Sequence, residues 1–146
     1  MRKFQFQYQK ILDLRQKEVD SAKAVYGKAV KDFEAARKQY EQYKADELDI
    51  QREIASCDSM TSHDLHTRYH YLMRIKQQKE QQLVKVNEYE KYMKSKQQEL
   101  VNAYKEEKKW DKLSEIEKEE YVAEQIKIEQ SVLDEISIQR YIMKNY

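Results

Sequence analysis

The sequence predicts an all-α protein in which two long helices form an antiparallel coiled-coil hairpin with an overhanging C-terminal helix. Three observations lead to this expectation. The 146 residues include no proline and one glycine, so the residues that most often break or weaken helices are nearly absent. Charged residues make up 38% of the chain, as is typical of long solvated helices. Aromatic residues make up 11%, which argues against disorder.

The first half of the chain carries a heptad, in which apolar residues recur alternately every three and four positions. The heptad is interrupted by two polar residues, Arg15 and Glu47. Large side chains alternate with alanines along it, in the order Leu12, Val19, Ala22, Tyr26, Ala29, Phe33, Ala36 and Tyr40. This alternation lets two helix backbones approach closely. We therefore predict a first helix over about 4–57.

A cluster of small polar residues ends this heptad between Ser56 and Ser62. Such clusters favour turns, and we place the turn at about 58–61. Thr61 is expected to cap the following helix, because its hydroxyl can accept a hydrogen bond from an otherwise free backbone amide. The acidic side chain of Asp64 also favours a helix start.

A second helix is expected over about 62–142. Its expected apolar stripe consists of Leu65, Tyr69, Leu72, Leu83, Val86, Met93, Leu100 and Tyr104. A short turn makes the two helices antiparallel, so facing positions should add to about 119. Phe33 would then face Val86.

The two arms of this hairpin are unequal, so residues 119–146 should overhang the first helix. The heptad is expected to change register after Trp110, leaving a second apolar stripe at Val122, Ile126, Leu133 and Ile136. Residues 111–146 contain nine acidic and five basic residues. An apolar stripe that the hairpin does not cover is a candidate docking surface. The whole chain, 1–146, is expected to form a single coiled-coil domain.

The composition also bears on enzymatic and cofactor-dependent functions. A single glycine leaves no glycine-rich phosphate loop, and carboxylates on a coiled coil diverge into solvent, so we expect no enzyme and no cofactor. His66 and His70 share a helix face near His63, but two ligands leave a tetrahedral zinc site incomplete, so no metal is predicted. Cys57 is expected to be a resting thiol.

Nucleic acid and membranes are also unexpected partners. The formal net charge is +1, and the basic, tyrosine-containing stretch over 65–96 is interpreted as a solvated helix face. No apolar run approaches the roughly 20 residues that span a bilayer. The opening residues, 1–5, lack the apolar segment of a secretory signal.

Three segments resemble the flagellar type III export protein family called FliJ. The opening, over 4–15, has an aromatic pair followed by an apolar pair and an arginine. The segment 71–75 resembles the family's aromatic-to-aliphatic step just after the turn. The segment 133–140 resembles the family's terminal Leu-Asp-Glu-aliphatic signature. The resemblance covers the whole chain and implies a two-helix fold similar to the central stalk of rotary ATP synthases.

The resemblance implies a cytoplasmic component of the bacterial flagellar export apparatus, peripherally associated with the inner face of the cell membrane at the flagellar base. The implied partners are the hexameric export ATPase, the cytoplasmic domain of the export-gate membrane protein, and export chaperones. In the family the gate contact is a four-residue face, which corresponds here to Tyr71, Ile75, Gln78 and Gln82. The two glutamines replace the usual alanine and histidine.

The export ATPase is expected to contact both ends of the chain. The candidate residues are Phe4, Phe6, Tyr8, Leu133, Ile136 and Arg140. Two alternatives remain open at this point. One is the related stalk of an injectisome secretion system, and the other is a purely structural coiled coil that dimerises through the uncovered C-terminal stripe.

Overall fold

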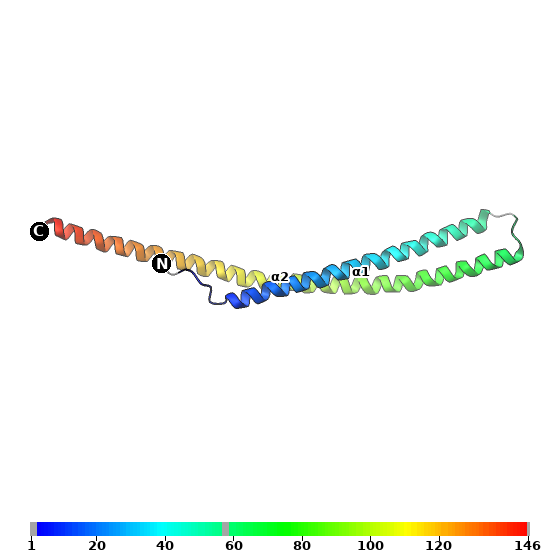
Figure 1. Cartoon of the computed structure of the whole chain (residues 1–146), viewed down its shortest axis with the longest axis horizontal. Coiled ribbons are helices and arrows are strands. Elements are labelled where there is room, and N and C mark those ends of the chain that lie inside the picture. The colour runs from blue at the N-terminus through cyan, green and yellow to red at the C-terminus, as the bar shows by residue number, and fades with distance from the viewer. Residues whose placement is uncertain (1–2, 57–58, 146) are drawn as a thin grey trace. The chain divides into compact units, whose positions relative to one another are not determined.

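The protein consists of two long helices that pack against each other as a hairpin (Figure 1). The computed structural model describes residues 3–56 and 59–145. Helix α1 spans Gln9–Ser56 and helix α2 spans Ser62–Asn145. The predicted all-α hairpin is therefore confirmed. The expected overhanging C-terminal helix is not a separate element, because the described residues up to Asn145 continue α2.

The two helices contribute to two compact units. Residues 20–101 form one unit, which contains most of α1 and the first half of α2. The described parts of 1–19 and 102–146 form the other, which contains the start of α1 and the second half of α2.

The heptad of α1 lies on the side of the helix that is removed from solvent. Each heptad position from Leu12 to Ile54 is buried or half-buried, including the two polar exceptions. Alanines are among the most buried residues, and Ala29 is only 1% exposed. This agrees with a close approach of backbones at small side chains. Cys57, the last position of the predicted heptad, lies outside the described residues.

The start of α2 is capped as its sequence predicts. The backbone amide of Asp64 donates a hydrogen bond to the Thr61 hydroxyl oxygen at 3.2 Å. The amide of Leu65 donates to the Thr61 carbonyl at 3.0 Å, which begins the helical hydrogen bonding. Thr61 therefore occupies the N-cap position and fixes the first helical residue at Ser62.

Polar contacts join the two helices within residues 20–101. Lys79 Nζ lies 2.5 Å from Glu47 Oε2, and Arg68 Nη1 lies 3.5 Å from Glu53 Oε1. Gln82 Nε2 donates to the carbonyl oxygen of Ala36 at 3.0 Å. The residue numbers in each pair add to about 120, as an antiparallel hairpin with its turn near residue 60 requires.

The apolar stripe predicted for α2 is partly wrong. Leu72, Val86, Met93 and Leu100 are buried or half-buried as expected, but Leu65, Tyr69, Leu83 and Tyr104 are exposed. Arg68, Lys79 and Gln82 take the inner positions instead. Their long polar side chains reach partners on α1, so the interface accepts them in place of apolar residues.

The predicted change of register after Trp110 is also wrong. The half-buried positions keep the spacing of three and four beyond this residue, at Ser114, Glu117 and Tyr121. Small and polar residues fill this continuation of the stripe, so hydrophobicity alone does not reveal it. Val122 and Ile126 lie on an exposed face of α2.

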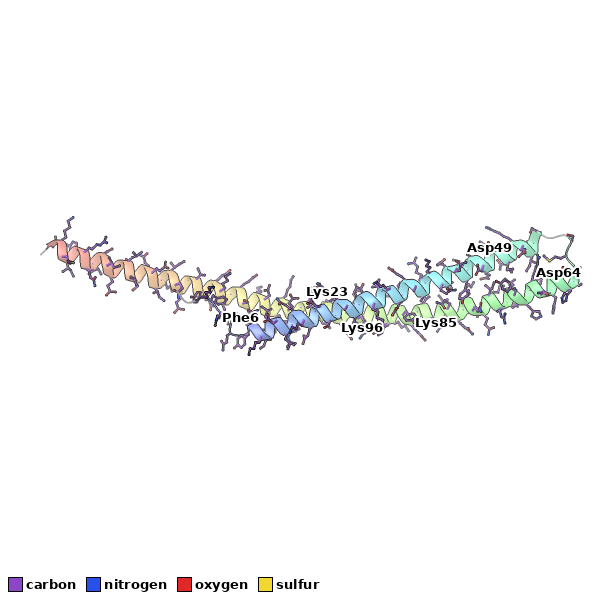
Figure 2. All side chains as sticks on the ribbon, viewed as in Figure 1. Phe6, Lys23, Asp49, Asp64, Lys85 and Lys96 are labelled. Atoms are coloured by element: carbon purple, nitrogen blue, oxygen red, sulfur yellow. The ribbon has the colours of Figure 1, made fainter. Side chains whose placement is uncertain are left out.

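Helix α1 begins at Gln9, although the sequence predicted a start near residue 4. Aromatic residues and glutamines alternate from Phe4 to Tyr8. In a helix, residues two apart point in different directions, whereas in extended backbone they point the same way. The non-helical conformation of this segment buries Phe6, which is 7% exposed (Figure 2).

Candidate docking surfaces

The gate-contact residues predicted from the sequence lie on α2 within the unit of residues 20–101, and they differ in exposure. Tyr71 is 49% exposed, and Gln78 is also exposed. Ile75 is 3% exposed, and the side-chain amide of Gln82 is bound to Ala36. The structure therefore presents Tyr71 and Gln78 to solvent and uses Ile75 and Gln82 to hold the hairpin together.

A second group of apolar side chains is exposed close to the turn. Tyr69 and Met73 are four residues apart on α2, so they share a helix face. The sequence analysis missed Met73 and assigned Tyr69 to the interface. The spacing of four from Leu65 through Tyr69 to Met73 is the signal that identifies this face.

The ion pair of Glu47 and Lys79 joins the two helices within the unit of residues 20–101. The hydrogen bond and the negative charge of the Glu47 carboxylate raise the pKa of Lys79 above its ordinary value, against the opposing effect of desolvation. Both side chains are largely shielded from solvent. The lysine therefore stays charged and paired across the neutral pH range.

The last part of α2 is exposed on all sides. Every described residue from Ile126 to Asn145 is exposed, including the predicted ATPase contacts Leu133, Ile136 and Arg140. Figure 2 shows the side chains along this red end of the helix standing free. The apolar residues of one broad face are Val122, Ile126, Val132, Leu133, Ile136 and Met143. We call residues 126–145 the exposed end of α2.

Charge changes sharply just before this exposed end. Residues 111–125 contain six acidic and two basic residues, whereas 126–146 contain three of each. The net charge of −4 that the sequence assigns to 111–146 is therefore carried by 111–125. An acidic stretch and an apolar end of zero net charge therefore follow each other along one helix.

The other predicted ATPase contacts, Phe4, Phe6 and Tyr8, belong to the unit of residues 1–19 and 102–146, in which Phe6 is buried, Phe4 is half-buried and Tyr8 is exposed. The ring of Phe4 lies 5.6 Å from that of Tyr121, and the ring of Tyr8 lies 5.6 Å from that of Trp110. Phe6 contacts Tyr8 edge to face at 5.9 Å. The rings of Phe4 and Tyr8 thus lie against α2, and Phe6 is buried next to Tyr8.

The histidines near the turn form a pair. His66 Nε2 and His70 Nε2 lie 2.9 Å apart on the exposed surface of α2. Within residues 3–56 and 59–145, no group of three or more potential metal ligands lies together. Over the same residues, no helix has a sufficiently long apolar stretch to cross a membrane.

The two packed helices define a helical protein of the coiled-coil hairpin class. The family model described as "Flagellar FliJ protein" matches residues 4–146, so the chain belongs to the FliJ family. This family is a non-enzymatic component of the flagellar export apparatus. The family resemblance found in the sequence is thus confirmed. No curated protein and no solved structure is significantly similar to the chain.

Proposed function

We propose that this protein is a coiled-coil stalk of the bacterial flagellar export apparatus. It binds the export ATPase hexamer through the exposed end of α2 and binds the cytoplasmic domain of the export gate through α2 near the turn. In this role it assists export chaperones and works in the cytoplasm, at the inner face of the membrane beneath the flagellum. Family membership supports the apparatus, and the exposed surfaces support the two contacts.

The exposed end of α2 is the observation that carries the ATPase assignment. Its apolar side chains, including Leu133 and Ile136, are in water although they lie on one helix face. A partner that covered them would gain about 25 cal/mol for each Å² of apolar surface buried. The acidic stretch at 111–125 favours a basic collar on that partner, and exposed Arg140 offers an additional polar contact.

The gate assignment depends on the face of α2 that contains Tyr71, Ile75, Gln78 and Gln82. Tyr71 supplies a large exposed ring beside the polar Gln78, which is a combination common in protein interfaces. Ile75 and Gln82 contribute by fixing this face against α1. Contact would thus be made by the two exposed side chains and shaped by the two inner ones.

Substitution of the exposed apolar residues tests the ATPase contact directly. Ile126→Ser, Leu133→Ser and Ile136→Ser, combined, should abolish stimulation of the ATPase and co-sedimentation with it. The matched control combines Lys127→Ser and Asp134→Ser, two exposed polar residues of the same segment. Because none of these side chains is buried, the circular dichroism of both variants should stay close to that of the parent.

A deletion of residues 130–146 provides a second test of the same contact. We expect the truncated hairpin to fold and to lose ATPase binding. Full stimulation by a folded truncation would contradict the proposal. A change in self-association without a change in ATPase binding would instead support a structural coiled coil.

A further inference from the structure

Residues 3–8 precede α1 and lie against α2, and we call them the N-terminal strap. It is non-helical, and its aromatic rings lie against Trp110 and Tyr121 of α2. The carbonyl oxygens of Phe6 and Tyr8 accept hydrogen bonds from the amides of Gln9 and Ile11, which tie the strap to the first turn of α1.

The strap lies against α2 beside the acidic stretch, most of whose carboxylates are exposed. Its rings contact Trp110, which immediately precedes this stretch, and Tyr121, which lies within it. The strap also begins with Lys3, an exposed basic residue that precedes Phe4 in the sequence. The strap therefore offers the same chemistry, apolar rings and positive charge, that the acidic stretch would find in a basic collar.

We propose that the N-terminal strap is a removable cover that competes with the ATPase for α2 between Trp110 and Tyr121. This inference rests on the proposed function. Each ring contact is individually weak, so the strap can leave α2 while both helices remain folded. The surface beneath it then becomes available to the collar, and the exposed end of α2 provides the first attachment.

The strap sets the apparent affinity through the fraction of molecules in which it is open. If it is closed in nine molecules of ten, apparent affinity is lowered about tenfold relative to the open state. Opening the strap by substitution should therefore tighten ATPase binding by up to that factor. If the strap instead contacted the ATPase directly, the same substitutions would weaken ATPase binding.

A pair of substitutions tests whether opening the strap strengthens or weakens ATPase binding. Phe4→Ala combined with Phe6→Ala should tighten binding to the purified ATPase hexamer several-fold, measured by isothermal titration. The matched control combines Gln5→Ala and Gln7→Ala, two exposed residues of the same strap. The control should bind like the parent. Weaker or unchanged binding by the phenylalanine variant would overturn the inference.

A cross-link tests the cover without relying on substitution alone. Phe4→Cys and Tyr121→Cys, placed in a Cys57→Ser background, can be joined by a short cleavable bismaleimide linker, because the two rings they replace lie 5.6 Å apart. We expect the linked protein to bind the hexamer at least about tenfold more weakly than the same protein after cleavage. Equal binding before and after cleavage would overturn the inference.

The two tests also separate this inference from the proposed function. If the parent chain binds the ATPase and the strap variants show the wrong sign, the stalk function stands and the strap is a contact. If neither the parent nor the variants bind, the stalk function fails, and the strap inference is rejected with it.

Discussion

Tyr71 and Ile75 lie one helical turn apart on α2, and substitution should separate their roles. Ile75→Ala should lower the free energy of unfolding by about 2–5 kcal/mol, because it removes a buried side chain from the helix interface. Tyr71→Ala should change it by less than about 0.5 kcal/mol, because half of that ring is already in water. Urea denaturation followed by circular dichroism measures both values.

The same tyrosine should matter for binding to the export gate. Tyr71→Ala is expected to weaken that binding, whereas the control Tyr69→Ala removes an identical side chain of similar exposure and should not. Equal affinities of the two variants for the purified cytoplasmic gate domain would remove Tyr71 from the contact. Ile75→Ala is unsuitable as a surface probe, because loss of folding would reduce binding indirectly.

The pair of Lys79 and Glu47 gives stability a defined dependence on pH. The pKa of Lys79 is raised in the folded state, mainly by its hydrogen bond to Glu47. A raised pKa means that the folded state holds the proton more tightly than the unfolded state does. The pair's contribution is therefore complete below the ordinary lysine pKa of 10.5 and is lost as pH rises through the higher folded value.

We expect the parent protein to lose melting temperature more steeply above pH 10.5 than the Lys79→Met variant. The variant Lys76→Met, which changes a neighbouring half-buried lysine, is the control and should follow the parent. Parallel curves for the parent and Lys79→Met would show that the pair contributes nothing. A double replacement, Glu47→Leu with Lys79→Leu, should be neutral or stabilising, because it removes both charges together.

At the scale of the elements, the capping of α2 depends on one hydroxyl group. Thr61→Ala should cost about 1 kcal/mol, because the Asp64 amide loses its acceptor. Thr61→Asp should recover most of this stability, since aspartate is an equally good N-cap. Ser59→Ala, in the same turn, is the control. Equal unfolding free energies for Thr61→Ala and the parent would show that the cap is dispensable.

The elements that the sequence predicted well share a local cause. The heptad of α1 and the Thr61 cap each follow from residues that are close together in the chain. Alternating large side chains and alanines indicate the inner face without reference to a partner, and a hydroxyl before an acidic first turn indicates a helix start. The structure confirms both.

The elements that the sequence analysis missed depend on distant partners. Arg68 and Gln82 are counted as surface residues by a hydrophobic pattern, and only Glu53 and the Ala36 carbonyl explain their inner positions. The strap alternates with a period of two for too few residues to be distinguished from a helix start. Its partners, Trp110 and Tyr121, lie near the other end of the sequence.

At the scale of the whole molecule, we predict that residues 1–146 unfold as a single domain. Helices α1 and α2 each run through both compact units, so neither unit has a helix that is entirely its own. Cooperative loss of both helices should then give coincident transitions by different probes. The chain offers a convenient pair of probes, because its single tryptophan lies in the unit of residues 102–146.

The measurement compares thermal melts followed by circular dichroism and by Trp110 fluorescence. Coincident midpoints would support one domain, and an earlier fluorescence transition would mean that the second unit unfolds separately. Tyr8→Ala serves as a control for the probe. It removes the ring 5.6 Å from Trp110 and should shift the emission to the red without moving the main transition.

The N-terminal strap also has a consequence for the order in which the chain folds. During synthesis the strap leaves the ribosome long before Tyr121 does. Phe4 therefore lacks its partner on α2 while the residues between them are made. Contacts near the turn, such as Glu53 with Arg68, close short loops and can form early, whereas the strap closes the longest one. The nascent chain should therefore form its contacts from the turn outward, and the contacts of the N-terminal strap should form last.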